Sequence, residues 1–266
     1  MTRSHLLALF FALFAACIGI YFTDIGGQYH TFILNFIFLL PPLLAVAGGI
    51  GAVREYGIKN MHGRALLYIT LGLAAWFIGE TLFAVYDVVL HIDPYPSIAD
   101  AFYLLAYPLI LVGIFKEIFN YKTDMNPIRS IVISIVSIIL SILVFALSIQ
   151  PSYSSGASAL ENLIAMSYGV GDLILIVGVS HILMLTMDFQ GGKLYRAWTY
   201  VIVAVCFMLL GDMLYAIYTQ QYNDNNPLFK RIDLLWIVSY LAFAYGLFEL
   251  KFIIRDVQDR VGSLLT

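Results

Sequence analysis

The segment GRALLYITLGLAAWFIGETLFAVY, residues 63–86, is an apolar run with a single acid, Glu80, near its end. A helix of about 20 apolar residues is long enough to cross the hydrocarbon core of a bilayer. Backbone groups in lipid must be hydrogen-bonded within the segment, and the alternating pattern of a barrel strand is missing. This segment therefore predicts a membrane-spanning α-helix that carries a carboxyl group.

The rest of the chain repeats this pattern. Of its 266 residues 61% are hydrophobic and only 12% are charged, whereas soluble domains carry about 25% charged residues. The chain is predicted to be an all-α polytopic membrane protein, surrounded by membrane lipid. It has no basic stripe, so we expect no nucleic-acid partner. The expected spans are residues 5–22, 31–53, 64–90, 97–119, 128–149, 160–187, 196–220 and 231–254.

The distribution of lysine and arginine predicts the orientation. Twelve of the fourteen lie at the two termini and in the second, fourth and sixth loops, and only Lys230 and Arg231 lie in the odd-numbered loops. Positive loops face the cytoplasm. We therefore expect a multi-pass cell-membrane protein with both termini in the cytoplasm. The first apolar block follows Arg3 and has no clear cleavage pattern, so it is interpreted as a retained signal-anchor helix.

Two segments of the chain are related at an offset of 132 residues. In residues 63–86 and 195–218, Gly79 aligns with Gly211 and Glu80 with Asp212. At an offset of 133, Asp100 aligns with Asp233. Two four-helix halves of the same topology, residues 1–124 and 125–266, are the simplest explanation.

Carboxyl groups inside the apolar blocks are the candidate functional residues. Glu80, Asp172 and Asp212 lie at central or outer-leaflet depth, where an ionisable side chain costs about 2.5–3.5 kcal/mol on insertion scales. No lysine or arginine lies deep in a span to neutralise them. They are either interhelical polar contacts beside small residues or a site for a ligand, an ion or a proton. Asp87 follows Glu80 by one heptad, on a similar helix face.

Asp100 has two interpretations. Ser97 and Asp100 form the sequence signature of a capping box at the start of a helix. Asp233, its counterpart, has Lys230 where the serine would be, so capping cannot explain both acids. We therefore expect the two acids to close an acidic, tyrosine-rich pocket on the external side. Its predicted ligand- or ion-binding residues are Glu80, Asp87, Asp100, Asp172, Asp212, Asp233, Tyr107, Tyr168 and Tyr240.

Cofactors and catalytic residues are not predicted. The five histidines include no pair with the spacing of a metal-binding helix and no two clearly opposed for haem ligation. No span carries an interior lysine for a retinal Schiff base. An intramembrane metal-dependent hydrolase is a weaker alternative, in which His30 and His91 approach the outer acids. Whether the acids bind a metal stays open.

Several motifs together resemble a known family. FIGETLFAVYD (77–87), DPYPSIADAFYLLAYPLILVGIF (93–115), MSYGVGDLILIVG (166–178) and RIDLLWIVSYLAFAYGLFEL (231–250) are similar to an eight-helix bacterial membrane domain that precedes GGDEF diguanylate cyclase, EAL phosphodiesterase or histidine kinase modules. The chain departs from that pattern at Gly169, usually proline, and at Glu80, often aspartate. The matching positions, within about residues 60–250, are Glu80, Pro96, Ser97, Asp100, Tyr103, Tyr107, Pro108, Tyr168, Asp172, Asp212 and Asp233.

The resemblance implies a sensory input module without catalytic residues, and an output domain is not present in these 266 residues. We therefore expect an unidentified small ligand or cation from the external side, and a separate signalling protein at the cytoplasmic C-terminus as a partner. The alternative function is a transporter or channel for a cation or small solute, because internal duplication and intramembrane carboxylates are also typical of transporters. In that case Pro41 and Pro42, together with the glycine run Gly48, Gly49 and Gly51, give the second span a kink or hinge.

Overall fold

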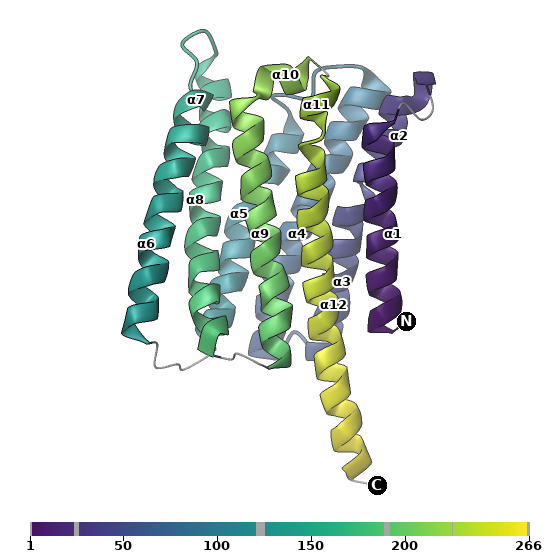
Figure 1. Ribbon diagram of the computed structural model, residues 1–266, viewed down its shortest axis with the longest axis vertical. Helices are drawn as coiled ribbons and strands as arrows, with labels where there is room; N and C mark the ends of the chain where they lie inside the picture. The colour runs from purple at the N-terminus through teal and green to yellow at the C-terminus, as the bar shows by residue number, and fades with distance from the viewer. Residues whose placement is uncertain (1, 24–26, 121–125, 189–191, 225, 265–266) are drawn as a thin grey trace.

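The computed structural model describes residues 2–23, 27–120, 126–188, 192–224 and 226–264, and within these ranges its regular structure is helical throughout. Eight of its helical segments are long and apolar enough to cross a membrane. They stand side by side as a bundle (Figure 1). The prediction of an all-α chain with eight helices long and apolar enough to span a membrane is therefore confirmed. The predicted seam between residues 124 and 125 lies outside the described residues.

The first four spans comprise the elements from α1 to α5, and the second of them is broken before two prolines. α1 (Arg3–Phe22) is followed by the 3₁₀ turn η1 (Gly27–Tyr29) and by α2 (His30–Phe38) and α3 (Leu40–Tyr56). The break at Leu39 precedes Pro41 and Pro42, because proline nitrogens donate no helical hydrogen bond. α4 (Met61–Ala84) continues into the π-helical segment η2 (Val85–Leu90), and α5 (Ile98–Ile118) is the fourth span.

The second four spans begin with α6 (Pro127–Val144), which is capped by Asn126 and continues through η3 (Phe145–Ile149) into α7 (Gln150–Ser152). α8 (Ala159–Asp188) and α9 (Lys193–Ile217) follow. The short helices α10 (Thr219–Asn223) and α11 (Pro227–Lys230) lead into α12 (Asp233–Leu264). α12 ends at Leu264, ten residues beyond the predicted end at residue 254, and its C-terminal part projects beyond the bundle (Figure 1).

Close helix pairs fix the positions of the polar side chains. α4 packs on α5 and α9 packs on α12. A methyl group on Gly113 would lie 2.8 Å from the carbonyl oxygen of Ala65, and one on Gly246 would lie 2.9 Å from that of Ala197. Such close backbone approach is typical of small residues between membrane helices. Two further helices join these pairs. α3 packs on both α4 and α12, and α8 packs on both α5 and α9.

The glycines of α3 contribute to packing. A methyl group on Gly48 would lie 3.0 Å from the carbonyl oxygen of Ala244 on α12, and one on Gly49 would clash with Thr70 on α4. The helix is continuous through both positions. The break of this span therefore lies at Leu39, and these glycines allow α3 to approach its neighbours.

Between its two ends the bundle interior is mainly apolar, and the buried hydroxyl of Thr70 bonds the carbonyl oxygen of Leu66 on its own helix. Ile69, Leu73 and Trp76 on α4 are buried together with Ile110 on α5 and Phe243 on α12. Buried carboxyl groups lie on either side of this layer: Asp100, Asp172 and Asp233 towards the end that carries α10 and α11, and Glu117 and Glu249 near the opposite end. The layer separates these two polar regions.

Candidate functional site

Glu80 lies at the centre of the predicted site and is bonded by two tyrosines. Tyr103 on α5 donates to its Oε2 atom at 2.8 Å, and Tyr240 on α12 donates to its Oε1 atom at 2.9 Å. A methyl group on Gly79 would lie 2.9 Å from the ring of Tyr103. The missing side chain at Gly79 therefore makes room for the aromatic ring that bonds the next residue.

The same arrangement, a glycine that makes room for an aromatic donor to the following acid, is found at Asp172 and Asp212. Trp236 on α12 donates from Nε1 to Oδ1 of Asp212 at 2.8 Å, and a methyl group on Gly211 would lie 2.6 Å from that nitrogen. Tyr107 on α5 donates to Oδ1 of Asp172 at 3.4 Å, and a methyl group on Gly171 would lie 2.6 Å from its ring. Each glycine–acid dipeptide thus brings an aromatic donor from a neighbouring helix onto its acid.

Asp100 caps its own helix and also accepts a hydrogen bond from a tyrosine of a neighbouring helix. Its Oδ2 atom accepts from the backbone nitrogen of Ser97 at 2.7 Å, and the Ser97 hydroxyl accepts from Ala99, so the predicted capping box is present. Its Oδ1 atom accepts from the hydroxyl of Tyr168 on α8 at 2.6 Å. The cap therefore leaves one oxygen free to join α5 to α8.

Asp233 is held by two tyrosines instead of a serine cap. Tyr21 on α1 donates to Oδ2 at 2.7 Å, and Tyr222 on α10 donates to Oδ1 at 2.5 Å. The side chain is 9% exposed. Lys230 places its ammonium 3.9 Å from the centre of the Tyr222 ring and near the Asp233 carboxylate. Asp233 therefore ties the start of α12 to α1 and to the α10 turn.

These five acids and their aromatic partners form one connected group, which we call the acid–aromatic cluster. Tyr103 and Tyr168 are neighbours, with ring centres 6.4 Å apart, and Trp76 lies against Tyr107 and Tyr240 at 5.7 and 6.2 Å. The cluster draws on α1, α4, α5, α8, α9, α10 and α12. Its members are Glu80, Asp100, Asp172, Asp212, Asp233, Tyr21, Tyr103, Tyr107, Tyr168, Tyr222, Trp236 and Tyr240.

Asp87 lies apart from the cluster. It is exposed, and its Oδ2 atom lies 3.5 Å from the side-chain nitrogen of Asn35. The sequence placed it one heptad from Glu80 on a similar face. The π-helical segment η2 begins between the two residues, and its wider turns rotate Asp87 away from the buried face.

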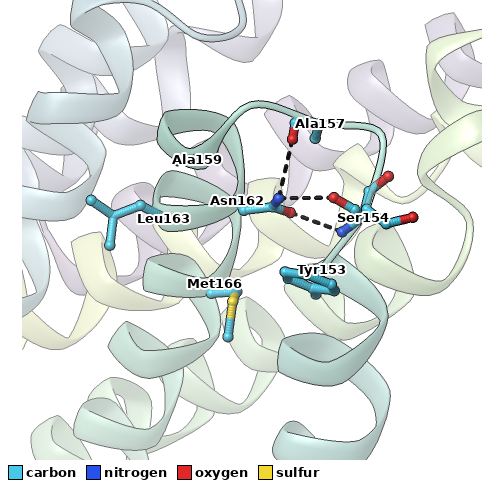
Figure 2. A pocket seen from close by; sticks show the side chains of 8 residues that line it. Tyr153, Ser154, Ala157, Ala159, Asn162, Leu163 and Met166 are labelled. Carbon is cyan, nitrogen blue, oxygen red and sulfur yellow. Dashed lines mark hydrogen bonds between the residues drawn. The ribbon is translucent and has the colours of Figure 1, made fainter.

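Donors from the protein itself reach at least one carboxylate oxygen of every acid in the cluster. Figure 2 shows a pocket elsewhere, beside the turn between α7 and α8. There the Asn162 side chain bonds the backbone nitrogen and oxygen of Ser154, both at 2.8 Å. The polar groups of that pocket serve to close the turn. A second pocket lies at the start of α9, beside Lys193.

His62 and His181 have partners outside the acid–aromatic cluster. His62 contacts both carboxylate oxygens of Glu117 at 3.0 Å, and His181 contacts the carbonyl oxygen of Val177 at 2.8 Å. His91 ends η2 with a left-handed backbone. Within the described ranges, no three histidine, cysteine or acidic side chains gather closely enough to hold a metal ion.

The predicted site omitted four of the seven aromatic donors in the cluster. Tyr103, Trp236, Tyr21 and Tyr222 were not among the predicted ligand-binding residues, although Tyr103 belongs to the family pattern. Trp236 aligns with Tyr103 at the offset of 133 residues, so the repeat carried a signal for it. Glu117 and Glu249, the second buried polar region, were also missed. Glu249 pairs with Arg3 at 3.2 Å.

Comparison of the chain with family models, with curated proteins and with solved structures found no match. The contacts of the acid–aromatic cluster are therefore the basis for a functional proposal.

Proposed function

We propose that this chain is an integral membrane sensory or ligand-binding module, in which the acid–aromatic cluster responds to a small ligand or cation from the external side. Buried ionisable groups in membrane spans are costly and usually serve function. Five acids share one end of the bundle, and most of them have only neutral aromatic or backbone donors as partners. A cationic ligand is the chemistry that such a group favours.

The observation that carries this proposal is the role of α12. Asp233, Trp236 and Tyr240 all lie on its first turns and contact the cluster. The same helix extends past the opposite end of the bundle (Figure 1). Its 32 residues are longer than the roughly 20 that a membrane requires. A change in the cluster would therefore move a rigid element that reaches a partner protein on the other side.

The proposal includes two four-helix halves of the same topology. Two matched contacts support it: Tyr103–Glu80 corresponds to Trp236–Asp212, and the approach of Gly113 to Ala65 corresponds to that of Gly246 to Ala197. Both follow the offsets found in the sequence. An even number of spans places both termini on the same side of the membrane. The lysine and arginine counts favour the cytoplasm as that side.

The proposal follows from the residues and from the resemblance to sensory membrane domains of the GGDEF, EAL and histidine kinase proteins. Transport is the competing function, and it needs a polar route between the two ends. The buried layer of Ile69, Leu73 and Phe243 separates the cluster from Glu117 and Glu249. This layer favours sensing over transport.

The test is a distance measurement on the protein in lipid nanodiscs. With Cys206 replaced by serine, spin labels at Lys59→Cys and Val257→Cys report the position of the α12 extension relative to the bundle. We expect this distance to change on acidification or on addition of sodium, calcium or an amine. A control pair at Lys59→Cys and Phe119→Cys, which does not include α12, should stay constant. A constant distance between the labels at positions 59 and 257 under every condition would contradict the proposal. Cation flux across the membrane of vesicles that contain the protein would also contradict it.

A further inference from the structure

The five acids of the cluster differ in how many donors they receive. Glu80, Asp100 and Asp233 each have a donor on both carboxylate oxygens. Asp172 and Asp212 each have a donor on Oδ1 alone, from Tyr107 and Trp236 respectively. A carboxylate oxygen buried without a donor carries the full cost of its lost hydration. Only these two acids carry that cost.

The two oxygens without donors belong to neighbouring side chains. The Oδ2 atoms of Asp172 and Asp212 are both buried, and no N–H or O–H group among the described residues donates to either. The carboxyl groups lie within hydrogen-bonding reach of each other. Asp172 is 0% exposed. Two like charges at this separation in a dry interior repel strongly, as in other paired carboxyl groups.

Among the described residues, the titratable side chains that interact with the pair are Tyr107 from α5, Tyr240 from α12 and Glu80 from α4, and none of them is positively charged. η3, which also packs on α8, consists of residues Phe145–Ile149 and has no titratable side chain. Tyr107 has one hydroxyl hydrogen, so it serves one of the two acids at a time.

We propose that Asp172 and Asp212 bind a single proton between their Oδ2 atoms, which makes this carboxyl pair a proton-binding site of the module. One proton turns one of the two oxygens into a donor and leaves the other as its acceptor. All four oxygens of the pair are then satisfied, and the pair carries one negative charge instead of two. The site is part of the cluster on which the proposed function rests, and it names the proton as a ligand of that cluster.

The site joins α8 to α9, a contact outside the two close pairs α4–α5 and α9–α12. Asp172 is on α8, Asp212 is on α9, and the partner of Asp212 is Trp236 on α12. Loss of the shared proton would place two repelling carboxylates between α8 and α9. The Trp236 hydrogen bond would transmit the resulting movement of α9 to α12.

The test is infrared spectroscopy of the full chain in nanodiscs, because the carbonyl stretch of a protonated carboxyl group is separate from that of a carboxylate. We expect the wild type to show, near neutral pH, a band for one protonated carboxyl group that disappears on alkalinisation. Asp172→Asn and Asp212→Asn should each abolish the band, because an asparagine amide donates in place of the proton. Glu80→Gln, which changes an acid that already has two donors, should keep it.

Three outcomes would overturn the assignment: a wild type without the band, a band that survives both asparagine variants, or a band that sodium removes at constant pH. Thermal unfolding guards against misfolded variants. The wild type should lose stability as pH rises through the loss of the band, whereas Asp172→Asn and Asp212→Asn should not. A movement of α12 without the infrared band would contradict the shared proton and leave the sensory function standing. The infrared band without any movement of α12 would support the shared proton and contradict the proposed sensory function.

Discussion

The hydroxyl of Tyr240 on α12 lies 2.9 Å from Oε1 of Glu80 on α4, across 160 positions of sequence. Together with the Tyr103 hydroxyl on the other oxygen, it gives both carboxylate oxygens of Glu80 a donor from the protein. The contact joins the first four spans to the last helix of the second four. The contribution of this contact to the free energy of unfolding can be measured.

Tyr240→Phe should destabilise the fold by about 1–2 kcal/mol. Hydrogen bonds between membrane helices are worth about 0.6 kcal/mol on average and up to about 1.7, and here the loss also leaves a carboxylate oxygen without a donor. Thermal unfolding in detergent measures the change. The double variant Tyr240→Phe with Glu80→Gln should cost less than the sum of the two single changes, because they remove the same contact. Additive effects would mean that the contact carries no energy.

Gly211→Ala should destabilise the bundle, because its methyl group would lie 2.6 Å from Nε1 of Trp236 and push this nitrogen off Asp212. Gly19→Ala on α1 is the matched control, since a methyl group there meets no atom within 4 Å. Alanine is the better helix former by about 1 kcal/mol, so the control should be neutral or stabilising. Equal effects of the two substitutions on the unfolding temperature would contradict the close approach at Gly211.

Most of the fold follows from hydropathy and from turn residues. Eight apolar blocks correspond to eight spans, Ser97 and Asp100 form the predicted capping box, and the span with Pro41 and Pro42 is broken. These features depend on residues near each other in sequence. The π-helical turns at η2 and the extension of α12 to Leu264 lacked such local signals.

The acids of the site could be predicted, but their donors largely could not. A carboxyl group in an apolar run stands out in the sequence, because placing an ionisable side chain inside a membrane costs free energy. Tyr21 and Tyr222, in contrast, look like ordinary tyrosines at membrane interfaces, and only the fold brings both to Asp233. The expectation that Asp87 joins the site assumed regular helix geometry, which η2 does not have. Helix packing, and not residue spacing, decides these contacts.

Asp233→Asn should destabilise the protein more than Asp256→Asn. Asp233 is 9% exposed and accepts from two tyrosines, so the substitution leaves one hydroxyl facing an amide hydrogen. Asp256 pairs with Arg3 at 3.0 Å and Lys193 at 2.9 Å, but its side chain is 35% exposed. Exposed ion pairs are worth about 0–1 kcal/mol. Added salt should therefore erase the effect of Asp256→Asn, as seen in the unfolding temperature, and leave that of Asp233→Asn unchanged.

Alkaline pH should weaken the contact between α10 and α12. Burial raises the pKa of Tyr222 well above its ordinary value of 10.0, and the nearby Asp233 carboxylate raises it further. A group whose pKa is raised by folding contributes stability that is fully present below the unfolded pKa and is lost as pH rises past it. The loss should begin near pH 10 and reach up to about 1.4 kcal/mol per pH unit. Tyr222→Phe should lower stability at neutral pH and flatten this alkaline decline, measured by chemical unfolding at several pH values. Tyr29→Phe, at a tyrosine that is 62% exposed, is the control and should keep the decline. An equally steep decline in Tyr222→Phe would show that other groups cause it.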